Sequence, residues 1–195
     1  MMDRFGALLI WILFGILDWH SMAEGTDCSK PPDFSTLQTC CASPTMTFEA
    51  FKSQCGKYMP AGSPRLSPCL YECIFNASNT LDGTEINVQN ARNMMQKILG
   101  NNQGFTDAYT EGLENCSNFV DEMMKYSRRR PPALPGVEVC SSLPVLFAMC
   151  SQKYVFVHCP PASWTNSDAC EHSKEYSLNC QSTKQSRGGS SHRVG

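Results

Sequence analysis

The longest periodic run of apolar residues in the chain extends from Phe105 to Met124. Its apolar positions recur at intervals of three and four, a spacing that places side chains on one face of an α-helix. These positions are Phe105, Ala108, Tyr109, Gly112, Leu113, Cys116, Phe119, Val120, Met123 and Met124. The pattern predicts one helix over 105–124 whose apolar face points inward.

Helix-start signals predict two further helices before this run. Ser67 is followed by Pro68, and proline is favoured at the first helical position because the N–H that it lacks would have no helical partner. This pair predicts a helix over 67–75. Asp82, with a glutamate three positions later, resembles a capping box and predicts a helix over 82–99 that ends before a glycine.

The remaining apolar segments are shorter. A short helix is expected over Phe48–Cys55 and another over Val139–Gln152. Residues 154–157 fit either an extended segment or a helix. The Arg- and Pro-rich stretch over 128–136 is expected to be a linker. No alternation sufficient for a sheet occurs, so the predicted fold class is all-α.

The two ends of the chain differ in composition from its middle. An apolar run of about 11 residues within 1–25 is too short to span a bilayer and is typical of a secretory signal peptide; an uncleaved signal anchor is the alternative. Residues 181–195 are polar and rich in Gly and Ser, which predicts a disordered tail. One domain is therefore expected over 26–180, with a C-terminal extension at 160–180.

Charge and motifs argue against several function classes. Acidic and basic residues nearly balance once 1–25 are removed, so neither nucleic acid nor an anionic membrane is an expected partner. No hydrolase or metalloprotease motif is present, and the histidines are isolated, so no catalytic residue and no cofactor are predicted.

Twelve cysteines follow the predicted signal peptide, a number typical of an oxidising compartment. Six disulfides are expected, and no metal site, because no four-ligand zinc set is completed. The cysteines are Cys28, Cys40, Cys41, Cys55, Cys69, Cys73, Cys116, Cys140, Cys150, Cys159, Cys170 and Cys180.

The cysteine spacing resembles that of insect odorant-binding proteins. Cys69 and Cys73 stand four positions apart, and Cys116 follows after 42 residues. Cys150 and Cys159 are separated by eight residues. Additional features resemble the Plus-C subgroup, and they are Cys140, Pro160, Trp164, Cys170 and Cys180. The resemblance extends from about Cys28 to Cys180 and implies a compact, multi-helix domain stapled by disulfides.

The resemblance also implies three interlocked bridges. One would join Cys73 to an early cysteine, which could be any of those at positions 40, 41 and 55. The others would join Cys69 to Cys150 and Cys116 to Cys159. The remaining pairings stay open.

The resemblance implies a secreted carrier that binds small hydrophobic molecules, such as odorants, in an apolar cavity. Soft Met and Phe side chains on the inward helix faces suit such a cavity. The predicted lining is Met94, Met95, Ile98, Phe105, Tyr109, Leu113, Phe119, Met123, Leu146, Phe147 and Phe156. An odorant receptor or a second copy of the chain are further candidate partners. The alternative is a secreted inhibitor or signalling ligand with a solid core.

Overall fold

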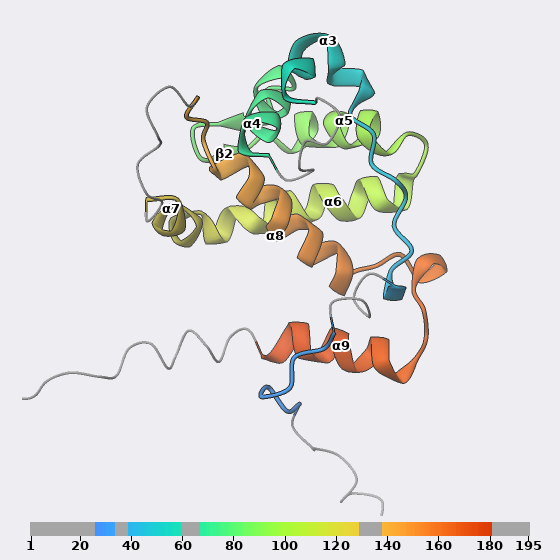
Figure 1. Cartoon of the computed structure of the whole chain (residues 1–195). Helices are drawn as coiled ribbons and strands as arrows, with labels where there is room; N and C mark the ends of the chain where they lie inside the picture. Colours follow the sequence, from blue (N-terminus) through green and yellow to red (C-terminus); the bar gives the residue numbers. More distant parts are fainter. Residues whose placement is uncertain (1–25, 34–38, 60–66, 129–137, 181–195) are drawn as a thin grey trace, which may run out of the picture. The chain divides into compact units, whose positions relative to one another are not determined.

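A computed structural model describes residues 26–33, 39–59, 67–128 and 138–180, except for the side chains of 126–128 (Figure 1). The predicted signal peptide, the predicted tail and most of the predicted linker lie outside these ranges. The described residues divide into two units, one within 32–174 and one made of 26–31 with 175–180. Within the described ranges, no helix is both long enough and apolar enough to cross a membrane.

The predicted all-α class is confirmed, because helices make up most of the described residues (Figure 1). A single pair of two-residue antiparallel strands, β1 (Leu81–Asp82) and β2 (Glu85–Ile86), is described beside them. The α-helices described are α3 (Lys52–Cys55), α4 (Pro68–Ala77), α5 (Val88–Leu99), α6 (Gln103–Cys116), α7 (Val120–Arg128), α8 (Leu143–Val157) and α9 (Asp168–Asn179).

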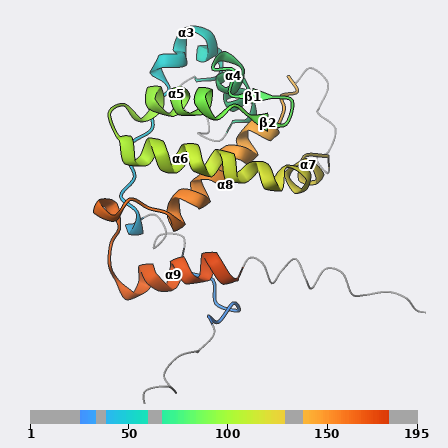
Figure 2. The same cartoon turned by 180° about the vertical axis from the view of Figure 1, so that it is seen from behind.

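Helix α6 is the central element of the larger unit. It packs against both α5 and α8, and α8 also packs against α4 (Figures 1 and 2). Its sequence explains this position, since most of its residues are buried and only a narrow polar stripe reaches solvent. A helix that is apolar over so much of its circumference needs neighbours on several sides.

The predicted continuous helix over 105–124 is wrong in its middle. Helix α6 ends at Cys116, a 3₁₀ turn (η4, Ser117–Phe119) follows, and α7 then begins. Three residues wound at three per turn shift the helical phase by about 60° relative to an α-helix. Phe119 therefore does not point inward as predicted, and 50% of it is exposed.

The predicted helix over 82–99 begins later than expected. Gly83 and Thr84 form the turn between β1 and β2, and Gly83 has a φ of 61°. Glycine at the first position of a two-residue hairpin turn readily adopts a positive φ, so a hairpin forms here and Asp82, paired with Glu85, does not cap a helix. Asn87 is the actual N-cap of α5, and its side chain accepts a hydrogen bond of 3.0 Å from the N–H of Asn90.

Other helix boundaries agree with the predictions in part. Ser67 and Pro68 begin α4 as predicted, although the Ser67 hydroxyl makes no capping hydrogen bond. The segment expected as a helix over 48–55 is split into η2 (Glu49–Phe51), α3 and η3 (Gly56–Tyr58). Helix α8 begins four residues later than predicted and continues to Val157, so residues 154–157 are helical.

All twelve cysteines are paired, which confirms the six predicted disulfides. The bridges are Cys28–Cys180, Cys40–Cys170, Cys41–Cys159, Cys55–Cys73, Cys69–Cys140 and Cys116–Cys150.

Two of the implied bridges are wrong. Cys69 pairs with Cys140 rather than Cys150, and Cys116 pairs with Cys150 rather than Cys159. Cys150 lies on α8, which packs against α6, so it is in reach of the end of that helix. The interlocked order of the three implied bridges is nevertheless retained. Among the six cysteines from Cys55 to Cys150, the first pairs with the third, the second with the fifth and the fourth with the sixth.

Cys159 instead fixes the start of the C-terminal extension through Cys41. Cys41 also forms an isolated antiparallel bridge with Trp164, and the Trp164 ring meets Phe156 edge-on at 5.5 Å between centroids. Residues 159–170 of the extension are thus attached to the helical core by backbone, aromatic and disulfide contacts.

Candidate ligand-binding site

Most of the predicted cavity-lining residues lie together in one hydrophobic core. Helix α5 contributes three of them, α6 three, α7 one and α8 one, and each is at most 8% exposed. These residues are Met94, Met95, Ile98, Phe105, Tyr109, Leu113, Met123 and Phe147. Residues from four helices, spread over more than 50 positions of sequence, therefore share one apolar interior.

The other three predicted residues lie at or beyond the edge of this core. Leu146 and Phe156 are partly buried and pack against it from α8. Phe119 is half exposed, as described above, and is not among the residues that pack against the core. The prediction that Phe119 shares an inward face with Tyr109 and Leu113 is therefore wrong.

Helix α4 also contributes to this core, and its residues were not among those predicted from the sequence. Leu70, Ile74 and Phe75 are each at most 4% exposed and belong to the same cluster. The spacing of four between Leu70 and Ile74 places them on one helical face and could have been recognised.

The core holds no charged side chain among the described residues. Besides the Tyr109 phenol, the buried polar side chains of the described residues are hydroxyls of Thr and Ser: Thr80, Thr106, Thr110, Ser142, Ser151 and Ser173. Burying an unpaired charge in such surroundings is costly. A guest held here would therefore be neutral and mostly apolar.

Tyr109 shows the effect of these surroundings on an ionisable group. Burial raises the pKa of its phenol to about 12, and the neighbouring Tyr71 adds to the shift. Burial also raises the pKa of Tyr71. The surroundings of both phenols therefore disfavour the charged phenolate.

Methionine side chains make part of the core adaptable in shape. The sulfur of Met94 accepts a hydrogen bond of 3.5 Å from the hydroxyl of Thr80, which is fully buried. Met95 and Met123 lie elsewhere in the same cluster. Because methionine side chains are unbranched and polarisable, they can adopt new rotamers around guests of different shape.

An open pocket of about 350 Å³ lies apart from these residues, beside α3, η3 and α4. Its lining is mixed in character and includes Lys57, Glu72 and the disulfide cysteines Cys69 and Cys73. Asn76, the first residue of an Asn-Ala-Ser glycosylation sequon, also lines it. The polar lining makes this pocket unsuited to an apolar guest.

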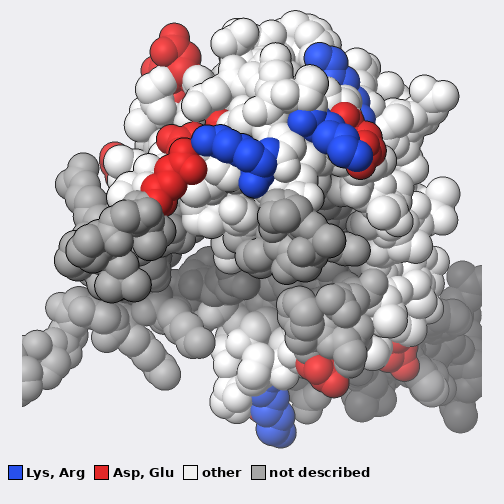
Figure 3. All heavy atoms as spheres, turned by 45° about the horizontal axis from the view of Figure 1, so that its top comes forward, with Lys and Arg blue, Asp and Glu red and all other residues white. Residues whose placement is uncertain are grey.

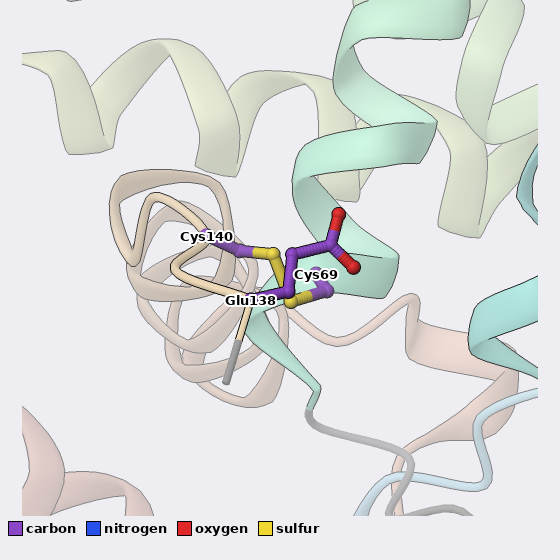
Figure 4. A group of neighbouring side chains, drawn as sticks. All are labelled: Cys69, Glu138 and Cys140. Atoms are coloured by element: carbon purple, nitrogen blue, oxygen red, sulfur yellow. A yellow bond between two sulfur atoms is a disulfide. The ribbon is translucent and has the colours of Figure 1, made fainter. Parts of the chain in front are cut away.

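Glu138 lies beside the Cys69–Cys140 bridge (Figure 4). This grouping is not a thiolate metal site, because the two sulfurs are bonded to each other at 2.00 Å. The Tyr58 hydroxyl donates to Glu138 Oε1 at 2.7 Å, and Lys57 Nζ lies 3.3 Å from the same oxygen. Both contacts lower the pKa of Glu138, and the hydrogen bond from Tyr58 has the larger effect. The disulfide attaches the segment before α8 to α4, and the contacts of Glu138 attach it to η3.

A comparison with family models finds one match. Residues 38–176 match the model described as AgamOBP47-like, which covers more than half of the chain and all the helices described above except the last residues of α9. No curated protein matches the chain.

Proposed function

Because the chain belongs to the AgamOBP47-like family of insect odorant-binding proteins, we propose that it carries small hydrophobic molecules non-covalently in its helical core. The family is one of carriers rather than enzymes, and a small hydrophobic ligand is what it implies. The Plus-C subgroup remains a prediction. Odorants and related signal molecules are the proposed cargo, and chemosensory receptors the proposed destination.

One observation supports this proposal above the others: a Met- and Phe-rich core with no charged side chain among the described residues, held by interlocked disulfides. Disulfides restrict the unfolded chain and commonly contribute about 2–4 kcal/mol each to stability. That contribution offsets part of the cost of opening space in a core. A cross-linked core can therefore admit an apolar guest without losing its fold.

The surface charge agrees with a neutral small-molecule ligand. On the face shown in Figure 3, acidic and basic side chains lie next to one another between stretches of uncharged surface. No single sign of charge dominates that face, and a net charge of −2 for the whole chain is small. Attraction of a polyanion needs a strong basic field.

The proposal includes secretion, for which the signal peptide at 1–25 and the paired cysteines are the support. Expression of the full chain in insect cells tests this part. We expect the protein in the medium, with a new N-terminus between Glu24 and Asp27. Retention of an uncleaved chain in the membrane fraction would favour the signal anchor.

Ligand binding is tested by titrating the refolded or secreted protein with N-phenyl-1-naphthylamine, an apolar dye that fluoresces more strongly in apolar surroundings. We expect saturable enhancement at about one dye per chain, and displacement by volatile apolar compounds. Bovine ribonuclease A, a disulfide-bonded protein that is not a carrier, serves as the control for non-specific dye binding.

The solid-core alternative is favoured by one observation, the mutual packing of the eight buried lining residues in a single cluster. If the dye does not bind the folded protein, this alternative becomes the better account. The chain would then present its surface to a protein partner, as an inhibitor or signalling ligand does.

A further inference from the structure

Thr106 on α6 carries a buried hydroxyl with no hydrogen-bond partner among the residues that the structure describes. The residue is 0% exposed. Its backbone is engaged normally, since the N–H donates to the carbonyl of Asn102 at 3.0 Å. Only the side-chain hydroxyl of Thr106 donates no hydrogen bond to a described residue.

Thr110, one turn further along α6, provides an internal comparison. It is 1% exposed, and its hydroxyl donates to the carbonyl of Thr106 at 2.7 Å. This back-bond to the preceding turn is the ordinary solution for a threonine inside a helix. Thr106 is buried to the same degree on the same helix but does not adopt it.

The hydroxyl of Thr106 lies within the apolar part of the molecule. Phe105 and Tyr109, its neighbours on α6, both belong to the core cluster, and α6 packs against α5, which supplies Met94 and Met95. A buried polar group without a partner is destabilising and is rare in proteins. Such a group inside a candidate binding region is a natural place for the polar atom of a guest.

We propose that Thr106 is the polar anchor of the binding site, donating a hydrogen bond to a single oxygen on an otherwise apolar ligand. This inference rests on the proposed carrier function. The ligand class it selects is the neutral ketones, aldehydes, esters and alcohols. Carboxylates are disfavoured, because no buried cation among the described residues compensates their charge.

The test compares two ligands of the same shape, 2-octanone and 2-methyl-1-octene, in which a methylene group replaces the carbonyl oxygen. Each is measured by displacement of N-phenyl-1-naphthylamine from wild type, Thr106→Val and Thr110→Val. The measured quantity is the ratio of the two affinities. The two ligands differ in hydration, but this difference is the same for every variant. It therefore cancels when the ratio of one variant is compared with that of another.

We expect Thr106→Val to shift this ratio against the ketone by about tenfold, the effect of losing one hydrogen bond in a buried site. Thr110→Val, whose hydroxyl already has a partner, should leave the ratio at the wild-type value. Thr106→Ser retains a hydroxyl and should retain the ratio. If Thr106→Val fails to fold by circular dichroism, Thr106→Ala is compared with wild type in its place.

An unchanged ratio in the Thr106 variants, with the dye still bound, would overturn the inference and leave the carrier function standing. An equal shift in Thr110→Val would also overturn it, because the effect would not be specific to the unpaired hydroxyl. Failure of wild type to bind the dye at all would overturn the carrier function, and the anchor with it.

Discussion

Gly112 on α6 and Ser151 on α8 lie so close that a Cβ built on the glycine comes within 3.1 Å of the Ser151 Cα. The Cβ of Tyr154, one turn along α8, is equally close. Because the Ser151 contact is with backbone, it cannot be relieved by rotating a side chain. The missing side chain at position 112 therefore sets how closely the two helices cross.

Gly112→Ala is expected to destabilise the protein by about 1–3 kcal/mol, because α8 must move away from α6 to admit the methyl group. Urea denaturation followed by circular dichroism gives the free energy of unfolding. Gly104→Ala, on the same helix, is the control, since its Cβ would lie 3.5 Å from the side chain of Pro160. That variant should be neutral or slightly more stable, as alanine favours helix. Equal effects of the two substitutions would contradict this account.

The second prediction concerns the disulfide pattern. Digestion of the unreduced protein and mass spectrometry of the linked peptides should recover Cys69–Cys140 and Cys116–Cys150. Alkylation without reductant should add no mass, since every cysteine is paired. Recovery of a Cys69–Cys150 peptide would restore the pairing implied by the resemblance and contradict the structure.

Removing one of these bridges should cost stability without changing the fold. The double substitution Cys116→Ser with Cys150→Ser is expected to lower the free energy of unfolding by about 2–5 kcal/mol. The bridge joins the end of α6 to α8. The measurement is the same urea denaturation, with far-ultraviolet circular dichroism as the check on helix content.

These pairings show where sequence reasoning reached its limit. The number of cysteines and their oxidised state follow from composition and compartment, and both were predictable. The partner of each cysteine depends on where the helices lie in space. Cys140 is ten positions before Cys150, and only the packing of α8 on α4 and α6 decides which of them meets Cys69.

The apolar spacing predicted burial correctly along α6 and at Met123 on α7, but not at the 3₁₀ turn between them. Tyr109 and Leu113 are buried as the three-four pattern predicts, because both lie on the uninterrupted α6. Phe119 matches the same pattern but is the last residue of a 3₁₀ turn, which the apolar spacing does not reveal. Likewise, Asp82 followed by Gly83 fits both a helix cap and the end of a strand before a hairpin turn, until the pairing of Asp82 with Glu85 is known.

The third prediction uses Phe147 and Phe119, both expected from the sequence to line a cavity. Phe147 is 0% exposed, whereas Phe119 is 50% exposed. Phe147→Asp should unfold the protein or lower its stability by at least about 3 kcal/mol, since it removes a core ring and buries a charge. Phe119→Asp should change stability by no more than about 0.5 kcal/mol and leave dye binding intact. Loss of dye binding by a folded Phe119→Asp would place that ring in the site after all.

The fourth prediction concerns the start of the C-terminal extension. The Trp164 ring contacts Phe156, and its Nε1–H donates to Glu171 at 2.6 Å. Trp164→Ala should weaken this attachment by about 1 kcal/mol and so increase the rate of proteolysis between Pro161 and Asp168 by about fivefold. Trp164→Phe keeps an aromatic ring and should fall between alanine and wild type. If alanine has no effect on cleavage, the disulfides alone hold the segment.

The last prediction follows from the buried phenol of Tyr109. Its pKa is raised from 10.0 to about 12 in the folded protein, chiefly by burial. Between these two values the unfolded chain has lost the proton and the folded protein still holds it. Stability that is fully present below pH 10 is therefore lost as the pH rises toward 12.

By pH 11 the loss from Tyr109 should be about 1 kcal/mol relative to pH 9. Urea denaturation at both pH values measures it, with exposures short enough to keep the disulfides intact. Tyr109→Phe has no proton to lose at this position and should show a smaller decrease over the same range. Tyr71, whose pKa burial also raises, remains in that variant and accounts for part of the residual slope. An identical pH dependence in wild type and Tyr109→Phe would mean that the phenol ionises as easily in the folded protein as in the unfolded chain, and that the interior around α6 admits water.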